Sequence, residues 1–365
     1  MVQSFCKPQL VTHRSIHIVG ARPNFMKAAP VVAASQALGD APMLIHTGQH
    51  YDEALSDVFF RQLGLPEPDV DLGVGSGTHA VQTAALMTAL ETTFLDMRPS
   101  EVVVYGDVNS TLAATLVAAK LHIPVAHVEA GLRSYDRTMP EEVNRVVTDA
   151  LATQLFVTSP EAVDHLRAEG IGPSGVYLVG NPMIDTLVRF RDQLDAGTIR
   201  SSLGLADRFG VVTLHRPANV DDPERAAAIV RGLDAISTTI PLVFPMHPRG
   251  QQTLESAGIL DIAGIIVVEP LGYLDFMSLV AEATLVVTDS GGIQEETSIL
   301  GVPCLTVRPN TERPITVTLG TNRLVEPEDL ATAARTAVAT RALPAEIPLW
   351  DGGAGARIAA LLGRD

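Results

Sequence analysis

Short runs of apolar residues, many of them β-branched, alternate with helical patterns along most of this chain. In the first half these runs cover residues 16–19, 43–46, 102–105, 125–128 and 155–157. In the second half they cover residues 211–214, 242–244, 265–268, 285–287 and 304–307. Continuous apolar strands separated by helices are typical of parallel sheets that are buried on both faces. The pattern therefore predicts an α/β protein built on parallel sheets.

The alternation is interrupted between Gly180 and Gly204, where the charged stretch 189–195 is typical of a connecting helix or linker. The chain has 365 residues, more than the roughly 100–200 of one domain. We therefore expect two doubly wound, Rossmann-like domains with a ligand cleft between them, the usual ligand position in such sheets. The expected division is 1–190 and 191–365. Whether the C-terminal helix packs back on the first domain is open at this point.

The charge balance and the cysteines narrow the choice of partners and compartment. Lys and Arg number 26 against 42 Asp and Glu, which gives a net charge of −16 and argues against nucleic acid or an anionic membrane as partner. Cys6 and Cys304 are too few and too far apart for a disulfide framework or a zinc site. Residues 1–15 lack the apolar core of a signal peptide, and no segment approaches the ~20 apolar residues of a membrane span. We expect a cytoplasmic protein.

The junction at residues 289–296 follows one of the apolar runs and begins a helix. Unpaired N–H groups and the positive end of the helix suit an anion there, and Gly291 and Gly292 let a diphosphate approach the backbone closely. Carboxylates one turn further, such as Glu296, are placed to hold hydroxyls of an attached sugar. An ordinary strand-to-helix turn with glycines for conformation is the alternative interpretation.

Three carboxylates and one lysine are expected on a common rim of the first sheet. Asp107 and Glu129 follow apolar runs, Glu141 begins a helix after Pro140, and Lys27 lies opposite them. Each alone could be a helix cap or a surface charge. Together they are the kind of groups that transfer protons, because crowding and burial raise the proton affinity of a carboxylate.

Other well-known sites are not indicated. The dinucleotide fingerprint Gly-x-Gly-x-x-Gly, the phosphate loop ending in Gly-Lys-Ser/Thr and the Gly-x-Ser-x-Gly elbow are all missing. His215 and His247 end apolar runs, but neither has a second metal ligand at helical spacing, and structural histidines are the alternative. We therefore expect neither a nicotinamide cofactor nor a catalytic metal.

Several longer motifs resemble those of the non-hydrolysing UDP-N-acetylglucosamine 2-epimerases. The matching segments cover the chain in order, at residues 20–27, 47–50, 106–107, 127–133, 140–145, 180–181, 215–216, 289–296 and 311–314. The most specific are His-Val-Glu-Ala-Gly-Leu-Arg from residue 127, Pro-Glu-Glu-x-Asn-Arg from residue 140 and Thr-Glu-Arg-Pro from residue 311. The resemblance implies a GT-B-type fold, a homodimer, and interconversion of UDP-GlcNAc and UDP-ManNAc.

The resemblance also implies roles for individual residues. UDP would leave as the C2 proton is lost, giving 2-acetamidoglucal, and would then add back after protonation of the opposite face. The implied catalytic set is Lys27, Asp107, Glu129, Glu141 and His215. The implied substrate-binding set is Arg22, His215, Arg216, Ser290, Gly291, Gly292, Glu296 and Arg313, with Tyr273 or Phe276 lining the uracil pocket or belonging to the core. Which carboxylate acts on which face of C2 stays open.

Some positions depart from the family pattern, and they bear on substrate and regulation. Pro217 and Ala218 stand where many members have Arg-Glu, and Gly272 stands where a larger or acidic residue is common. At the activating second UDP-GlcNAc site of bacterial members, Asp52 replaces an expected glutamine and Val81 a basic residue, so we expect no such activation. The alternatives to the main interpretation are a hydrolysing 2-epimerase, a 2-epimerase of a modified UDP-sugar, a GT-B glycosyltransferase and a non-catalytic UDP-sugar sensor.

Overall fold

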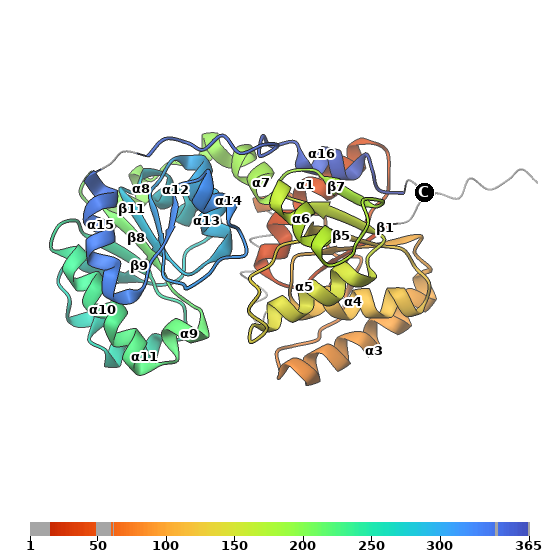
Figure 1. Ribbon diagram of the computed structural model, residues 1–365, viewed down its shortest axis with the longest axis horizontal. Helices are drawn as coiled ribbons and strands as arrows, with labels where there is room; N and C mark the ends of the chain where they lie inside the picture. The colour runs from red at the N-terminus through yellow and green to blue at the C-terminus, as the bar shows by residue number, and fades with distance from the viewer. Residues whose placement is uncertain (1–14, 49–59, 61, 340–341, 364–365) are drawn as a thin grey trace, which may run out of the picture.

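The computed structural model describes residues 15–48, 60, 62–339 and 342–363. Figure 1 shows two α/β lobes side by side, with the first half of the chain in one and most of the second half in the other. Within the described residues, each lobe contains one fully parallel sheet. The prediction of two doubly wound halves is confirmed.

The first sheet has seven strands in the order β3-β2-β1-β4-β5-β6-β7 among the described residues. Its strands are β1 (Ser15–Val19), β2 (Met43–His46), β3 (Val70–Asp71), β4 (Glu101–Tyr105), β5 (Val125–Ala130), β6 (Gln154–Val157) and β7 (Val176–Leu178). The central strands β1, β4 and β5 are buried along their whole length. This explains their continuous apolar runs, because helices cover both faces of the sheet.

The second sheet has six strands in the order β10-β9-β8-β11-β12-β13 in the described part of the chain. Its strands are β8 (Gly210–Thr213), β9 (Leu242–Pro245), β10 (Ile265–Val268), β11 (Leu285–Thr288), β12 (Cys304–Thr306) and β13 (Asn322–Leu324). In both sheets the strand order reverses beside the first strand, at β1/β4 and at β8/β11. Ligands of doubly wound sheets bind at the carboxyl ends of the strands at such a switch point.

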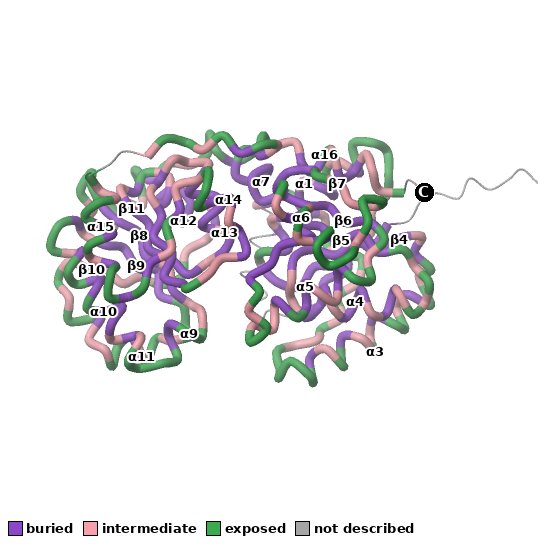
Figure 2. Tube along the Cα trace, in the orientation of Figure 1, coloured by how far each residue is buried: buried purple, intermediate pink, exposed green. Residues whose placement is uncertain are grey.

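Helices cover both faces of each sheet, and Figure 2 shows the buried strands between partly exposed helices. The first lobe contains α1 (Arg22–Ala37), α3 (His79–Met97), α4 (Asn109–Lys120), α5 (Pro140–Leu151), α6 (Pro160–Ala168), α7 (Pro182–Phe190) and α16 (Ala354–Ala359). The second contains α8 (Gly197–Leu203), α9 (Pro217–Val220), α10 (Pro223–Ser237), α11 (Gln251–Ser256), α12 (Tyr273–Glu282), α13 (Gly291–Leu300), α14 (Ile315–Thr318) and α15 (Leu330–Ala339). Short 3-10 turns lie at Arg191–Gln193, Ile259–Asp261 and Pro327–Asp329.

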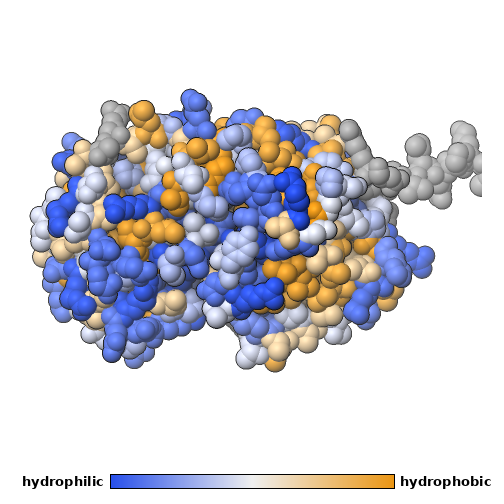
Figure 3. Space-filling model, viewed as in Figure 1, coloured by the Kyte–Doolittle hydropathy of each residue, from blue (hydrophilic) through white to orange (hydrophobic). Residues whose placement is uncertain are grey.

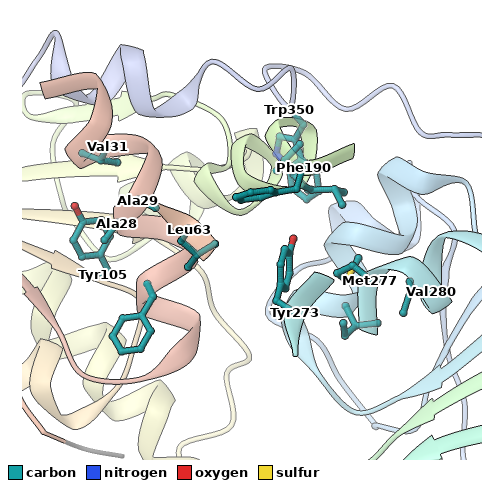
Figure 4. Packing of buried hydrophobic residues seen from close by; sticks show 14 of the residues in the cluster. Ala28, Ala29, Val31, Leu63, Tyr105, Phe190, Tyr273, Met277, Val280 and Trp350 are labelled. Carbon is teal, nitrogen blue, oxygen red and sulfur yellow. The ribbon is translucent and has the colours of Figure 1, made fainter. Parts of the chain in front are cut away.

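The C-terminal helix α16 lies against α1 in the first lobe, far from the rest of the second half (Figure 1). The backbone N–H of Gly355 donates to Asp185 at 2.6 Å, and a Cβ on Gly355 would lie 2.7 Å from the backbone of Pro30. The contact therefore depends on a glycine. Phe190 and Trp350 belong to one buried cluster that includes residues of both lobes, and Figure 4 draws them beside α7.

Candidate functional site

A cleft of about 740 Å³ lies between the two lobes. Its walls come from both halves of the chain. The first lobe contributes His79, Asp136 and residues 138–141, and the second contributes four arginines and two histidines, namely Arg216, Arg225, Arg249, Arg308, His215 and His247. Such a concentration of cations in a chain of net charge −16 marks a site for an anionic ligand.

Asp289 organises the wall of the second lobe from the end of β11. The backbone N–H groups of His215 and Arg216 donate to its carboxylate, and His215 Nδ1 lies 3.0 Å from Asp289 Oδ1. Burial would raise the pKa of Asp289, but the hydrogen bonds and charge of His215 outweigh burial and lower it. A fixed carboxylate on Nδ1 leaves Nε2 of the half-exposed His215 ring to meet a ligand.

The start of α13 lies directly after Asp289, with half-buried Ser290 as its N-cap. The side chain of Arg216 donates from Nε to the Asp289 carbonyl at 2.9 Å, so this cation and the helix start are neighbours. Gly291 is required for a close approach, because a Cβ there would meet the Arg313 guanidinium and lie 2.9 Å from Glu312 Oε1. The arrangement presents the positive end of a helix next to Arg216.

Glu129 lies at the end of β5 and is almost fully buried. Its carboxylate is 2.7 Å from Lys27 Nζ, and Gly106 makes room for this lysine, since a Cβ on Gly106 would lie 2.9 Å from Nζ. The backbone of Glu129 has φ 74°, and the pairing of β5 with β6 shifts register around it. A glutamate in the left-handed region costs conformational energy, and such residues concentrate at functional sites.

Asp107 follows β4 and remains partly exposed, with 22% of its side chain accessible. It forms an ion pair with Arg145, and Asn144 Nδ2 donates to its carbonyl at 2.8 Å. Burial would raise the pKa of Asp107, but the charges of Arg145, Lys27 and Arg313 together lower it. Asp107 is therefore a carboxylate at neutral pH, in the correct state to accept a proton.

Glu141 lies in the first turn of α5, is half-buried and lines the cleft together with His215. Of the expected site residues, Glu141, His215 and Arg216 thus form part of the cleft wall. Lys27 and Glu129 lie behind it in a buried ionic cluster, connected to the second lobe through Arg313. The side chain of Arg22 lies outside the described part of the structure.

Arg313 connects the two lobes. Its Nε donates to Glu295 at 2.8 Å, its Nη1 to Glu312, and its Nη2 to Glu129 of the first lobe at 3.0 Å. The side chain is buried, and three carboxylates surround the guanidinium. The role expected for Arg313 from the family resemblance, as a diphosphate ligand, stays a prediction.

Tyr273 and Glu296 meet between α12 and α13, where Tyr273 Oη donates to Glu296 Oε1 at 2.9 Å. Burial raises the pKa of Glu296 to about 8, against the opposing effect of this hydrogen bond. Figure 4 shows the Tyr273 ring between the lobes. Phe276 is half-buried and packs against the hydrophobic core. Neither aromatic ring is among the residues that line the cleft.

The sequence model of the UDP-N-acetylglucosamine 2-epimerase family matches residues 36–363. This chain belongs to that family. The UDP-N-acetylglucosamine 2-epimerase of Methanocaldococcus jannaschii is 43% identical over 318 residues, which cover 84% of this chain and 87% of the relative. The UDP-2,3-diacetamido-2,3-dideoxy-D-glucuronate 2-epimerase of Pseudomonas aeruginosa is also 43% identical, over 317 residues that cover 84% of this chain and 87% of the relative.

A solved structure of the same family agrees with the fold. The crystal structure of Methanocaldococcus jannaschii UDP-GlcNAc 2-epimerase in complex with UDP-GlcNAc and UDP has a TM-score of 0.89 and 40% sequence identity. The match covers 96% of this chain and 99% of that one. The fold of this family member is GT-B-type, with two Rossmann-like domains and parallel sheets, as predicted.

Some residues of the candidate site were not singled out from the sequence. Arg145, Glu295 and Glu312 lie inside motifs that were recognised. Arg308 directly follows the apolar run at β12, so it could have been chosen as a residue at the end of a predicted strand, as Asp107 and Glu129 were. His127 supports the turn before Asp107, because its ring bonds Asp149 at 2.6 Å and the Gly106 carbonyl at 2.8 Å.

Among the described residues of this family member, no group of three or more His, Cys, Asp or Glu side chains is arranged to hold a metal ion. In the same part of the chain, no helix is both long and apolar enough to span a bilayer.

Proposed function

We propose that this chain is a non-hydrolysing UDP-GlcNAc 2-epimerase that interconverts UDP-GlcNAc and UDP-ManNAc. The observation that carries the proposal is the pair of carboxylates Asp107 and Glu129 at the ends of the neighbouring strands β4 and β5, with Lys27 beside them. Glu141 of the first domain lines the cleft together with His215 and Arg216 of the second, and Arg313 of the second domain contacts Glu129. We infer that proton transfer and stabilisation of a diphosphate leaving group take place in this region between the domains.

The reaction can be written in two balanced halves. A carboxylate takes the C2 proton, the electron pair of that bond forms a C1–C2 double bond, and the C1–O bond breaks so that UDP leaves with its electrons. In the second half a proton is added to the opposite face of C2, and a diphosphate oxygen of UDP bonds again to C1. No electrons are exchanged overall. Asp107, Glu129 and Glu141 are the acid–base candidates, and Asp107, ionised at neutral pH, suits the role of base.

The leaving group needs strong stabilisation, because a proton beside an acetamido group is only weakly acidic. We infer that Ser290 and the N–H groups of Gly291 and Gly292 at the start of α13 receive the diphosphate, together with Arg216 and His215. Nε2 of His215 is directed to a ligand because Asp289 holds Nδ1. Preformed donors of this kind stabilise the developing charge without reorganising during the reaction.

One experiment tests the proposal against its alternatives. The protein is incubated with UDP-GlcNAc alone in deuterated water, and the products are followed by proton NMR. We expect UDP-ManNAc to form and deuterium to appear at C2 of both sugars. Retention of the C2 proton would overturn the elimination mechanism. Free ManNAc and UDP as products would identify a hydrolysing enzyme. The absence of turnover would identify a sensor, and turnover only after an acceptor is added would identify a glycosyltransferase.

A modified UDP-sugar is the second candidate for the substrate. It is favoured by the Pseudomonas aeruginosa relative, whose name specifies a 2,3-diacetamido glucuronate and whose identity to this chain equals that of the UDP-GlcNAc enzyme. Turnover of the two nucleotide sugars should be compared at equal concentration. A kcat/KM for the glucuronate at least tenfold above that for UDP-GlcNAc would favour this second candidate.

A homodimer belongs to the same proposal, and so does a cytoplasmic location. Val81 and Leu95 on α3, with Val143 and Leu151 on α5, are exposed apolar side chains of the first domain. Figure 3 shows apolar surface gathered where Figure 1 draws α4 and α5. Exposed apolar surface of this kind favours a contact with a second copy. Light scattering should give twice the 38.7 kDa chain mass.

A further inference from the structure

Residues 311–315, which we call the interdomain segment, are fixed on the second domain and reach the first. Thr311 Oγ1 donates to Gln294 at 2.7 Å, and the backbone N–H of Arg313 donates to Thr311 Oγ1 at 3.1 Å. Two contacts then cross to the first domain. Arg313 Nη2 donates to Glu129, and the backbone N–H of Ile315 donates to Glu161 of α6 at 3.1 Å. The segment therefore touches the first domain at one acid–base candidate and at one residue outside that group.

The contacts of Arg313 are directed at carboxylates rather than at the cleft. Each of its three guanidinium nitrogens donates to a different carboxylate, and only 8% of the side chain is exposed. Arg313 is not among the residues that line the cleft, whereas Arg216 and Arg308 are. A phosphate oxygen would have to compete with Glu129, Glu295 and Glu312 for these donors. This geometry indicates that Arg313 positions the three carboxylates around it rather than a ligand.

Glu129 needs such support from outside its own strand. Its backbone is in the left-handed region, so its direction is set by surrounding contacts rather than by a favourable local conformation. Lys27 binds one carboxylate oxygen, Oε2, and comes from the same domain. Arg313 binds the other, Oε1, and comes from the opposite domain. Both oxygens are held only when the two domains are in contact.

We propose that Arg313 is a positioning residue that fixes the Glu129 carboxylate for proton transfer when the domains close, and that it serves turnover rather than nucleotide affinity. The inference rests on the proposed function for its kinetic test. The acid–base group is then complete only when the two domains are closed. Closure of the nucleotide-binding domain thus also fixes Glu129 for proton transfer.

The test compares Arg313→Lys with Glu161→Ala. Lysine keeps the charge but cannot hold three carboxylates in the fixed geometry of a guanidinium. We expect Arg313→Lys to lower kcat on the order of 100-fold, the effect of a small misplacement of a reacting group, with the Kd for UDP changed by less than about threefold. Glu161→Ala removes the other crossing contact and should leave kcat within about threefold. Added guanidinium should partly restore Arg313→Ala but not Glu129→Gln.

The opposite results would overturn the inference. Weaker UDP binding with an unchanged kcat in Arg313→Lys would make Arg313 a diphosphate ligand. An equal loss of kcat in Glu161→Ala would mean that turnover depends on contact between the domains in general, and not on the contact of Arg313 with Glu129.

A second measurement does not depend on turnover. We expect UDP to slow amide hydrogen exchange at residues 129–132 in the wild type and in Glu161→Ala, but not in Arg313→Lys. Equal protection in Arg313→Lys and the wild type would contradict the inference. If the wild type fails to convert UDP-GlcNAc, the proposed function fails, and this exchange result still decides the role of Arg313.

Discussion

The three acid–base candidates lie in different electrostatic surroundings. Asp107 faces Arg145, Glu129 is held by Lys27 and Arg313, and Glu141 lines the open cleft. Two of them are therefore ion-paired before any ligand arrives. An enzyme that moves protons on both faces of one carbon needs two groups with different roles, and these candidates differ in their ion-pair partners and in their exposure.

Replacing each candidate by its amide should separate chemistry from binding. We expect Asp107→Asn, Glu129→Gln and Glu141→Gln each to lower turnover at least ~100-fold while the fold survives, because a positioned acid or base typically contributes that much. Asp164→Asn, in an exposed ion pair on α6, is the matched control. Near-normal rates for all three amides with unchanged UDP affinity would show that the active site lies elsewhere.

Glu296 should make stability depend on pH. Its pKa is raised from 4.5 to about 8 by burial, so the folded protein keeps a proton that the unfolded chain loses. The contribution of Glu296 is fully present below about pH 4.5 and is lost as the pH rises to about 8. Comparing wild type with Glu296→Gln, we expect the difference in unfolding free energy to change by up to about 1.4 kcal/mol per pH unit across this range. A pH-independent difference would contradict the assignment.

At the scale of elements, the start of α13 combines the proposed diphosphate site with the packing of Arg313. Gly291→Ala places a methyl group against the Arg313 guanidinium and Glu312. Alanine is favoured over glycine inside a helix by about 1 kcal/mol, so propensity alone would predict a gain in stability. We expect the clash to dominate and kcat/KM to fall at least tenfold.

Gly172→Ala, in an exposed loop of the first domain, is the control for this glycine. No atom lies within 4 Å of a Cβ added at Gly172, so both activity and thermal stability should be unchanged. An active and fully stable Gly291→Ala variant would show that the close approach at α13 is not required.

The sequence predicted most strands but missed three at the edges of the sheets. The apolar runs match β1, β2, β4, β5 and β6 to within a few residues, since these strands are largely buried. The edge strand β10 was predicted as well, at residues 265–268, whereas the edge strands β3, β7 and β13 were not. In β3, Val70 is half-buried and Asp71 exposed, so no apolar run marks it.

The residues of the site could be predicted only as far as strand ends and motifs show them. Asp107 and Glu129 follow apolar runs of the first sheet and His215 follows one of the second, so their positions at the carboxyl ends of the strands were predictable. The contact of Glu129 with Arg313 joins residues 184 positions apart, and no local pattern reports such a pair. The division at residues 190 and 191 and the individual site roles stay predictions.

At the scale of the whole molecule, we expect catalysis without an activating second UDP-GlcNAc. Val81 is exposed on α3 and offers no donor to a diphosphate, while Asp52, which would repel it, lies outside the described residues. UDP-ManNAc should be consumed from time zero with hyperbolic kinetics. A lag that trace UDP-GlcNAc abolishes would contradict this prediction.

The chain passes between the two domains twice. Arg189 contacts Leu63 of the first domain and Asp195 contacts Ser278 of the second. On the return, Ala345 contacts Ser298 and Trp350 donates to Thr158. We expect two connections to restrict the relative motion of the domains to rotation about the line that joins them, because sliding would stretch both. Such a restriction would bring the Arg313 guanidinium back to the Glu129 carboxylate at each closure and lower the entropy cost of re-forming that contact.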